Sequence, residues 1–218
     1  IRYDLASTQR QGGEVTNPYE GIAALGLEPL ARGWQNSHSA ALAEHVARAK
    51  TVIEVGSFMG ASVSWMADHN KAARFFCVDT FLGSPEISGE DLAGIPYQHG
   101  RLMLLERFLS NMVAAGISDR VTPIIQTSTS GAKILRRDGV SADLVYIDAG
   151  HDYLECYADL VSYVPLLAKG GVMIADDYSG FPGVRGAVER FCVEAGMEFE
   201  IVNGQAIMRQ RYRLQVEG

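Results

Sequence analysis

The feature that most constrains the fold is an alternation, from Thr51 onward, of short apolar segments with amphipathic helical segments. The apolar segments expected to form strands are 51–55, 74–79, 121–126, 144–148 and 172–175. Because each one is short and apolar throughout, it suits a strand that is buried on both faces of a parallel sheet. The sequence therefore predicts an α/β fold in which helices cover both faces of a mostly parallel sheet.

The end of the chain predicts an antiparallel hairpin. Phe199–Val202 and Gln205–Met208 are two apolar runs separated by Asn203-Gly204, which is a strong signal for a two-residue hairpin turn. Five parallel strands followed by such a hairpin differ from the six-stranded parallel sheet of dinucleotide-binding proteins. Helices are expected at 37–49, 101–116, 153–168 and 181–196. In the third helix, Pro165 should cause a kink or end the regular part, and Gly170-Gly171 should then stop the helix.

The domain organisation follows from where this alternation begins. A chain of 218 residues is long enough for one sizeable core, so we expect a single domain over residues 37–218. Residues 1–36 stand outside the alternation and are predicted to form an irregular arm or lid. Residues 81–100 are rich in Gly, Pro and Ser, which predicts a mobile surface loop.

Charge and composition narrow the function classes. A net charge of −7 and a pI near 5.2 disfavour binding to nucleic acid and favour a small molecule as substrate. No run approaches the roughly 20 apolar residues of a membrane span, and the first residues lack the pattern of a signal peptide, so we expect a cytoplasmic protein without membrane contact. A homo-oligomer is compatible with these features. The three cysteines match neither a zinc motif nor a disulfide framework and are expected to be buried thiols.

A glycine-containing turn after the first strand predicts a ligand site. Glu54-Val-Gly56-Ser-Phe58-Met-Gly60 leads directly into a helix, whose first N–H groups can face a ligand. Phe58 stands where a dinucleotide-binding pattern would need its middle glycine, which argues against a nicotinamide-dependent oxidoreductase. Asp79 ends the second strand, where a carboxylate can accept hydrogen bonds from ribose hydroxyls. The alternative for the glycine-containing turn is a purely structural role, and the alternative for Asp79 is a solvated aspartate at the start of a loop.

Acidic residues also follow two later strands. Asp148 ends one strand, and Asp176-Asp177 ends the next. Because the carboxyl ends of parallel strands meet at one edge of a sheet, these carboxylates should converge and repel one another unless a hard cation neutralises them. The sequence therefore predicts a site for Mg²⁺ or another divalent cation where these carboxylates converge.

Two segments carry a resemblance to a known family. Asp143–Tyr153 and Gly170–Tyr178, with 181–188 after them, are similar to metal-dependent O-methyltransferases of the macrocin and catechol types, and the similarity covers most of 51–209. The resemblance implies a class I, Rossmann-like methyltransferase fold with a seven-stranded sheet and S-adenosylmethionine as cofactor. It makes the three aspartates metal ligands and places His151 where the catechol enzymes carry a lysine base. The residues expected to bind the cofactor are Glu54, Gly56, Ser57, Gly60, Ser62, Asp79, Thr80, Ser128 and Asp148.

These expectations combine into a mechanism. The metal would lower the pKa of an acceptor hydroxyl, His151 or Asp148 would remove its proton, and the oxygen would attack the methyl group. A plain surface histidine is the alternative for His151. The acceptor would be a small molecule, with a sugar hydroxyl on a natural product as a refinement. The alternative functions are a metal-independent methyltransferase and a non-methylating protein that binds S-adenosylmethionine. The residues expected to hold the acceptor are Trp34, Gln35, His38, Tyr97, His99 and Tyr178.

Overall fold

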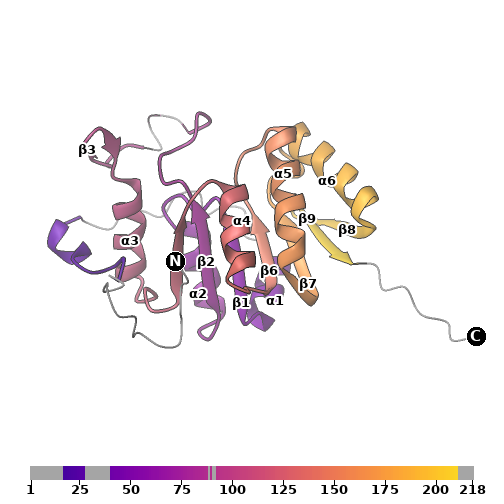
Figure 1. The fold of residues 1–218 in the computed structure, drawn as a ribbon, viewed down its shortest axis with the longest axis horizontal. Helices are drawn as coiled ribbons and strands as arrows, with labels where there is room; N and C mark the ends of the chain where they lie inside the picture. Colours follow the sequence, from indigo (N-terminus) through magenta and orange to yellow (C-terminus); the bar gives the residue numbers. More distant parts are fainter. Residues whose placement is uncertain (1–16, 28–39, 88, 90–91, 211–218) are drawn as a thin grey trace, which may run out of the picture.

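A seven-stranded sheet forms the centre of the molecule, with strand order β5-β2-β1-β6-β7-β9-β8 (Figure 1). We describe it from a computed structural model, which covers residues 17–27, 40–87, 89 and 92–210. The strands of this sheet are β1 (Thr51–Val55), β2 (Arg74–Asp79), β5 (Val121–Ile125), β6 (Ala142–Ile147), β7 (Leu167–Ala175), β8 (Met197–Val202) and β9 (Gln205–Gln210).

The strand directions confirm the predicted topology. Strands β5, β2, β1, β6 and β7 are parallel to one another, whereas β9 pairs antiparallel with both β7 and β8. The closing turn is Asn203-Gly204, with φ of 51° and 87°, between the paired residues Val202 and Gln205. Both turn residues have positive φ, as the favoured two-residue hairpin turns require.

Helices cover the two faces of the sheet as separate layers. One hydrophobic cluster packs α1, α2 and α3 against one face, and a second packs α4, α5 and α6 against the other. Figure 1 shows α4 and α5 side by side on the near face, with α6 next to α5. The helices are α1 (Ala40–Arg48), α2 (Ala61–His69), α3 (Leu104–Ala114), α4 (Ser128–Arg137), α5 (Tyr153–Tyr163) and α6 (Pro182–Ala195).

The predicted helix 153–168 is shorter in the structure. Helix α5 ends at Tyr163, a 3₁₀ turn covers Val164–Leu166, and strand β7 already begins at Leu167. Pro165 explains the end of the helix, because proline has no N–H to donate to the preceding turn. Gly170-Gly171 therefore lies inside a strand and does not end a helix.

The segment 81–100, predicted to be a loop, contains regular structure at its end. Strands β3 (Tyr97–Gln98) and β4 (Arg101–Leu102) form a small antiparallel hairpin, so α3 begins at Leu104 and not at the predicted residue 101. Phe81 and Ile95 are buried in the core on the α3 face. These contacts attach both ends of the segment to the domain.

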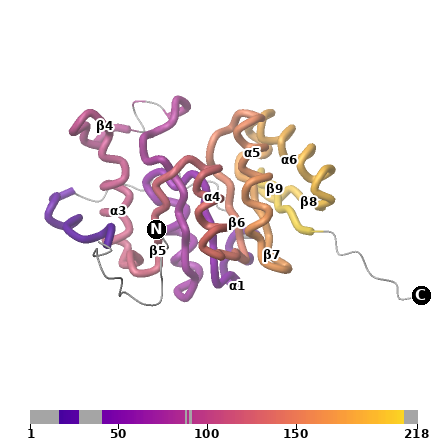
Figure 2. The backbone as a smooth tube through the Cα atoms, in the orientation of Figure 1, coloured from indigo at the N-terminus to yellow at the C-terminus, as the bar shows by residue number. Residues whose placement is uncertain are grey.

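Residues 17–27 of the predicted arm lie against α3, as the indigo segment in Figure 2 shows. The segment contains a 3₁₀ turn, Ile22–Leu25. The Tyr19 hydroxyl donates to the Val121 carbonyl at 2.8 Å, and the Ser110 hydroxyl donates to the Leu27 carbonyl at 3.0 Å. Trp34, Gln35 and His38 lie outside the described residues. In the part of the chain that the structure covers, no helix has the length and apolarity to cross a membrane.

Candidate active site

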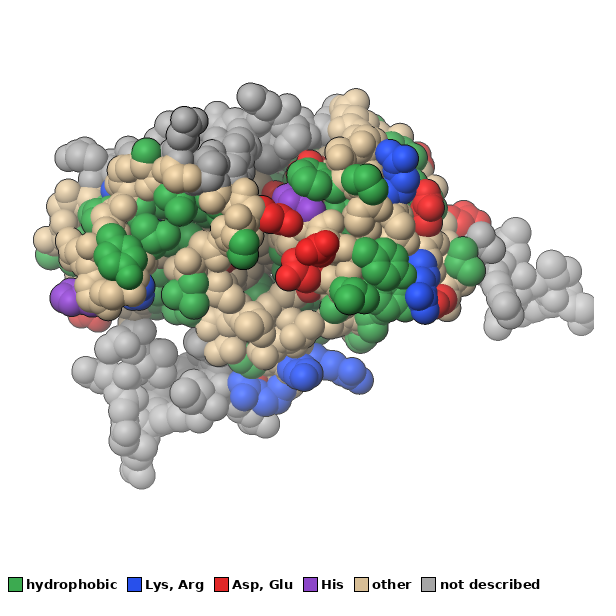
Figure 3. All heavy atoms as spheres, turned by 90° about the horizontal axis from the view of Figure 1, so that it is seen from above, with side chains coloured by type: hydrophobic (Ala, Val, Ile, Leu, Met, Phe, Trp, Pro, Cys, Tyr) green, Lys and Arg blue, Asp and Glu red, His purple; other side chains and the backbone are tan. Residues whose placement is uncertain are grey.

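The carboxyl ends of the parallel strands align the residues that follow them. The ladder of backbone hydrogen bonds continues one residue beyond the strands: Gly56 donates to Val78, Asp148 to Val55 and Asp176 to Ile147, at 2.8–2.9 Å. Figure 3 views this edge of the sheet and shows acidic and histidine side chains gathered near its middle, beside hydrophobic ones. The predicted convergence of these strand ends is therefore present.

A cavity of about 600 Å³ opens at this edge, a volume in the range of small-molecule sites. It combines polar groups at the strand ends with apolar walls from Phe58, Leu104 and Phe181. Eight residues predicted to bind the cofactor or to act as the base line it: Gly56, Ser57, Ser62, Asp79, Thr80, Ser128, Asp148 and His151. Asp176 and Asp177 also line it.

The loop after β1 must approach the strand-end backbone closely. Gly56 has φ of 87°, and a Cβ there would lie 1.9 Å from the carbonyl oxygen of Asp148. Asp79 holds the next part of the loop, since its carboxylate accepts the N–H of Phe58 at 2.8 Å and of Phe81 at 2.7 Å. Phe58 itself has a positive φ of 45°. The predicted cofactor turn is thus a tight loop fastened to the end of β2.

Glu54 and Gly60 do not line this cavity. The Glu54 carboxyl is fully buried and accepts a hydrogen bond from the Ser62 hydroxyl, which does face the cavity. Burial raises the pKa of Glu54 to about 7, although side-chain hydrogen bonds with Ser57, Ser62 and Cys77 lower it in part. Gly60 has φ of 83° and packs against α3, where a Cβ would meet Met112 at 2.3 Å. Glu54 therefore lies behind Ser62, and Gly60 shapes the loop.

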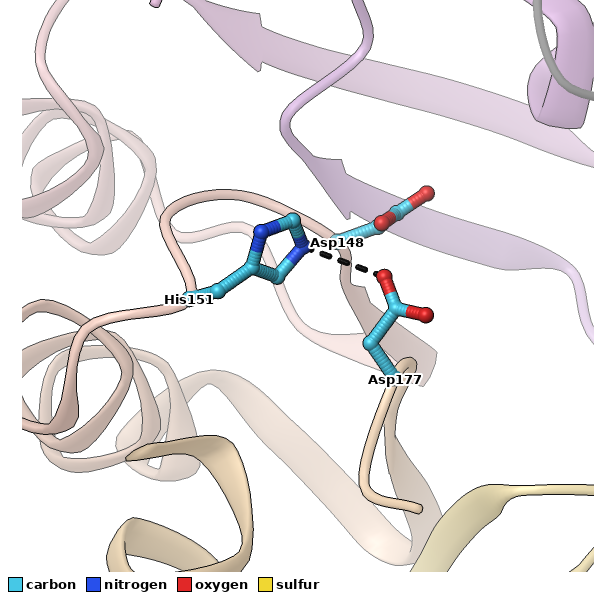
Figure 4. A group of neighbouring side chains, drawn as sticks. All are labelled: Asp148, His151 and Asp177. Carbon is cyan, nitrogen blue, oxygen red and sulfur yellow. Dashed lines mark ion pairs between the residues drawn. The ribbon is translucent and has the colours of Figure 1, made fainter. Parts of the chain in front are cut away.

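Asp148, His151 and Asp177 form the chemical centre of the cavity (Figure 4). One potential ligand atom from each residue lies within 4.8 Å of the other two. His151 Nε2 is 3.0 Å from Asp177 Oδ2, and His151 Nδ1 is 2.7 Å from Glu86 Oε2. The imidazole also stacks on the Phe181 ring, with ring centroids 4.0 Å apart. The histidine is thereby held between two carboxylates and an aromatic face.

The charges at this centre are unbalanced. Desolvation raises the pKa of the Asp148 carboxyl well above its usual range, and the negative charges of Asp176, Asp177 and Glu54 raise it further. The hydrogen bond to Asp177 raises the pKa of His151, and the Glu86 carboxylate adds to this effect. Crowded carboxylates with an imidazole among them are a donor set that suits a divalent cation.

Asp176 lines the cavity at the predicted strand end, and its carboxylate belongs to a hydrogen-bond network. Its carboxylate accepts hydrogen bonds from the Tyr146 hydroxyl, from Gln205 Nε2 at 3.1 Å and from the Asp177 N–H at 3.0 Å. Asp177 has a positive φ of 58°, which turns its side chain toward His151. The structure thus brings Asp148 and Asp177 together with His151 and engages Asp176 in a buried network beside them. Asp176 as a metal ligand stays a prediction.

Of the residues expected to hold an acceptor, the three that the structure describes, Tyr97, His99 and Tyr178, do not line this cavity. The Tyr97 hydroxyl donates to the Gly100 carbonyl on the exposed β3–β4 hairpin, which also carries His99. The Tyr178 hydroxyl donates to Glu189 at 2.9 Å, and its ring packs on Phe199. The loop reaches the cavity through other residues, namely Gly83, Ser84, Glu86 and Ile87.

Sequence reasoning missed three contributors to the site. In the sequence, Glu86 is only an acidic residue in a loop, Phe181 a residue at the start of a helix, and Asp159 a polar position on the segment that forms α5. Their partners come from distant parts of the chain, so their local sequence carries no signal for them. Asp159 receives a hydrogen bond from the Ser128 hydroxyl across 31 positions of sequence.

Comparison with known proteins defines the class. A family model described as a methyltransferase domain matches residues 53–178, which is more than half of the chain. The chain therefore belongs to this methyltransferase family, and its fold is the class I methyltransferase fold.

Individual similarities are more distant. The uncharacterized protein R132 of Acanthamoeba polyphaga mimivirus is 23% identical over 163 residues, which span 70% of this chain and 66% of that protein, just under two thirds. The calicheamicin methyltransferase CalS11 superposes with a TM-score of 0.57 at 21% identity, covering 78% of this chain and 76% of the other. An O-methyltransferase from Bacillus cereus in complex with SAH gives 0.56 at 16% identity, covering 88% and 90%. The two structural likenesses support the fold.

Proposed function

We propose that this methyltransferase transfers the methyl group of S-adenosylmethionine to a hydroxyl of a small molecule, with the help of a divalent cation such as Mg²⁺. One observation carries the proposal. A single cavity joins the loop at Gly56 and the Asp79 carboxylate to the group of Asp148, His151 and Asp177. The part of the cavity that suits a nucleoside and the part that holds the reactive side chains thereby belong to one site, whose volume suits a small-molecule ligand.

The cofactor would lie along the strand ends. Asp79 still has acceptor positions for the ribose hydroxyls, because a carboxylate has about four lone-pair sites and two backbone N–H groups use part of them. The Ser57 and Ser62 side chains and the loop at Gly56 would hold the methionine end. Glu54 would act from behind Ser62, where the negative charge of its ionised form favours the cationic ammonium and sulfonium groups. These roles agree with the family membership and are tested by binding.

A divalent cation fits the observed donor set. Asp148 and Asp177 would hold it, with His151 or Asp176 next to them. When bound, the cation would supply positive charge that offsets the repulsion among the carboxylates and favours the ionised form of an acceptor hydroxyl. The observation that supports this fit is the geometry of the group, since one potential ligand atom of each of Asp148, His151 and Asp177 lies within 4.8 Å of the other two. Desolvation raises the pKa of Asp148, and the nearby carboxylates of Asp176 and Asp177 add to this effect.

His151 would accept the proton of the acceptor. Asp177 can pair with His151 or with a cation; once its charge is committed to a cation, the histidine loses the partner that most raises its pKa. The neutral imidazole can then take up a proton, while Glu86 and Phe181 keep the ring in place. As the acceptor oxygen bonds to the methyl carbon, the carbon–sulfur bond breaks, the hydroxyl proton passes to His151 and S-adenosylhomocysteine leaves.

The acceptor would be a small hydroxyl compound, with a sugar as the more specific proposal. A second structure of CalS11 describes that protein as a TDP-rhamnose 3'-O-methyltransferase. The net charge of −7 on this chain supports a small acceptor over a nucleic acid. The apolar walls from Phe58 and Phe181 suit the face of a ring.

Calorimetric titration tests the proposal without a known acceptor. S-adenosylhomocysteine is first titrated into the protein, and Mg²⁺ or Mn²⁺ is then titrated into the saturated complex. We expect binding of one cation per chain, with at least tenfold weaker affinity in Asp177→Asn and no change in Asp119→Asn, which alters an exposed aspartate elsewhere. Absence of nucleoside binding would overturn the proposal. Nucleoside binding without cation binding would favour the metal-independent alternative.

The role of His151 is separated by a second variant. If His151 is the base, His151→Ala retains the affinity for the cation and loses methyl transfer, which is measured once an acceptor has been found. If cation affinity falls as far as in Asp177→Asn, the histidine is a ligand, as its place in the group with Asp148 allows. Glu86→Gln serves as a matched control, because it removes the carboxylate charge on the Nδ1 side of the imidazole and keeps the imidazole itself.

A further inference from the structure

A buried aspartate accepts the hydrogen bond of one hydroxyl group in the cavity wall. Ser128 is the first residue of α4 and lines the cavity, and its hydroxyl donates to the carboxylate of Asp159 on α5. Asp159 is only 4% exposed. The Tyr163 hydroxyl donates to the backbone carbonyl of Ser128 at 2.8 Å, so a second contact from the same helix fixes the residue. Ser128 is therefore held in one orientation by two side chains of α5.

The hydrogen bond to Asp159 determines what Ser128 can offer a ligand. A serine hydroxyl has one proton and two lone pairs, whereas an ionised carboxylate can only accept. Burial raises the pKa of Asp159 to about 6, which leaves it mainly ionised at pH 7.5. The single proton of Ser128 is then committed to Asp159. What remains for the cavity is a hydrogen-bond acceptor.

The position of Ser128 indicates which part of the cofactor it would meet. Asp79 ends β2, and β5, which leads into Ser128, is the neighbouring strand on the side away from β1 and β6. Asp148, at the end of β6, lies on the opposite side. With the ribose at Asp79 and the methyl donor toward Asp148, the base must extend toward Ser128. An adenine presents a donor there, its 6-amino group, next to the acceptor N1.

We propose that Asp159 is a positioning residue that makes the Ser128 hydroxyl an acceptor for the adenine 6-amino group, so that the site selects adenine over hypoxanthine. The first N–H groups of α4 have no partner within the helix and can complement the ring N1. Hypoxanthine reverses both groups, with an oxygen at position 6 and a proton on N1. This inference rests on the proposed function, because it assumes that S-adenosylmethionine occupies the cavity.

The test compares two ligands that differ only in the base. S-adenosylhomocysteine and its deaminated analogue S-inosylhomocysteine are each titrated into the wild-type chain, Asp159→Asn and Ser128→Ala at pH 7.5. In Asp159→Asn the new amide can donate to Ser128, which frees the serine proton to face the cavity. We expect the wild type to prefer the adenine ligand at least tenfold. The preference should fall at least tenfold or invert in Asp159→Asn. In Ser128→Ala it should fall to the part that the backbone N–H groups facing N1 still supply.

The ratio of the two affinities distinguishes this role from a structural one. A variant that only loosens the fold weakens both ligands equally and leaves the ratio unchanged, and that result would overturn the inference while the proposed function stands. Asp119→Asn should preserve both affinities. If Asp159→Asn does not fold, Ser128→Ala decides alone: an unchanged preference there rejects the inference. Failure of the wild-type chain to bind S-adenosylhomocysteine would reject the proposed function itself.

Discussion

The fully buried Glu54 should make the stability of this protein depend on pH in a way that one substitution removes. Desolvation raises the pKa of Glu54 from 4.5 to about 7, so the folded chain binds this proton more tightly than the unfolded chain does. At about 1.4 kcal/mol for each pH unit, this difference corresponds to about 3 kcal/mol. The stabilising effect is complete below pH 4.5, declines as the pH rises to about 7 and is lost above that.

Glu54→Gln is neutral at every pH and therefore lacks this dependence. The free energy of unfolding is measured by urea denaturation of both proteins between pH 4.5 and pH 8. We expect the wild type to lose about 3 kcal/mol relative to the variant across this range. Groups that titrate in both proteins and do not interact with Glu54 cancel in the comparison. The fixed cost of placing an amide beside Ser62 and Cys77 shifts the variant by the same amount at each pH.

The control is Glu44→Gln, which changes an exposed glutamate of α1. Its stability curve should run parallel to that of the wild type. Parallel curves for Glu54→Gln, within about 1 kcal/mol, would refute the argument that burial keeps this carboxyl protonated. Saturating S-adenosylhomocysteine offers a further check, because the ligand's ammonium should favour the ionised form of Glu54 and weaken the pH dependence.

Three further substitutions have defined outcomes. Gly56→Ala should lower the free energy of unfolding by more than about 2 kcal/mol and weaken the binding of S-adenosylhomocysteine, because φ is 87° and the new Cβ would lie 1.9 Å from the carbonyl oxygen of Asp148. A variant as stable in urea as the wild type would contradict this. Tyr146→Phe should cost about 1.5–3 kcal/mol, since it removes a buried donor to Asp176; an unaltered denaturation midpoint would count against that hydrogen bond. Val193→Ala, at a position that is 83% exposed on α6, should raise the free energy of unfolding by about 0.5 kcal/mol, because alanine has the higher helix propensity. A clear loss of stability would instead indicate a packing role for Val193.

The sequence located the parallel strands and the closing hairpin well, because both leave local signals. The predictions for β1 and β2 agree with the structure at both ends, and the Asn203-Gly204 turn is where the sequence places it. The α-helix ends just before Pro165, which is one of the two outcomes predicted there. The prediction was wrong at Gly170-Gly171, where pairing with β6 extends β7 backward through residues with weak strand propensity. Tertiary pairing therefore overrode the local preference.

The site shows the same division between local and distant information. A tight turn at Gly56 and acids after the strands are properties of short segments, so the sequence alone determined that Asp79, Asp148 and Asp177 would meet at one edge. Which groups touch one another depends on side-chain packing across the fold.

Only the tertiary structure decided the partners of these residues. Glu86 comes from a loop far along the chain to face His151, Asp176 turns to Tyr146 and Gln205, and Asp159 reaches Ser128 from another helix. The physical reason is that periodicity fixes which face of an element is buried, whereas the pairing of buried polar atoms is fixed by the distances between elements after they pack.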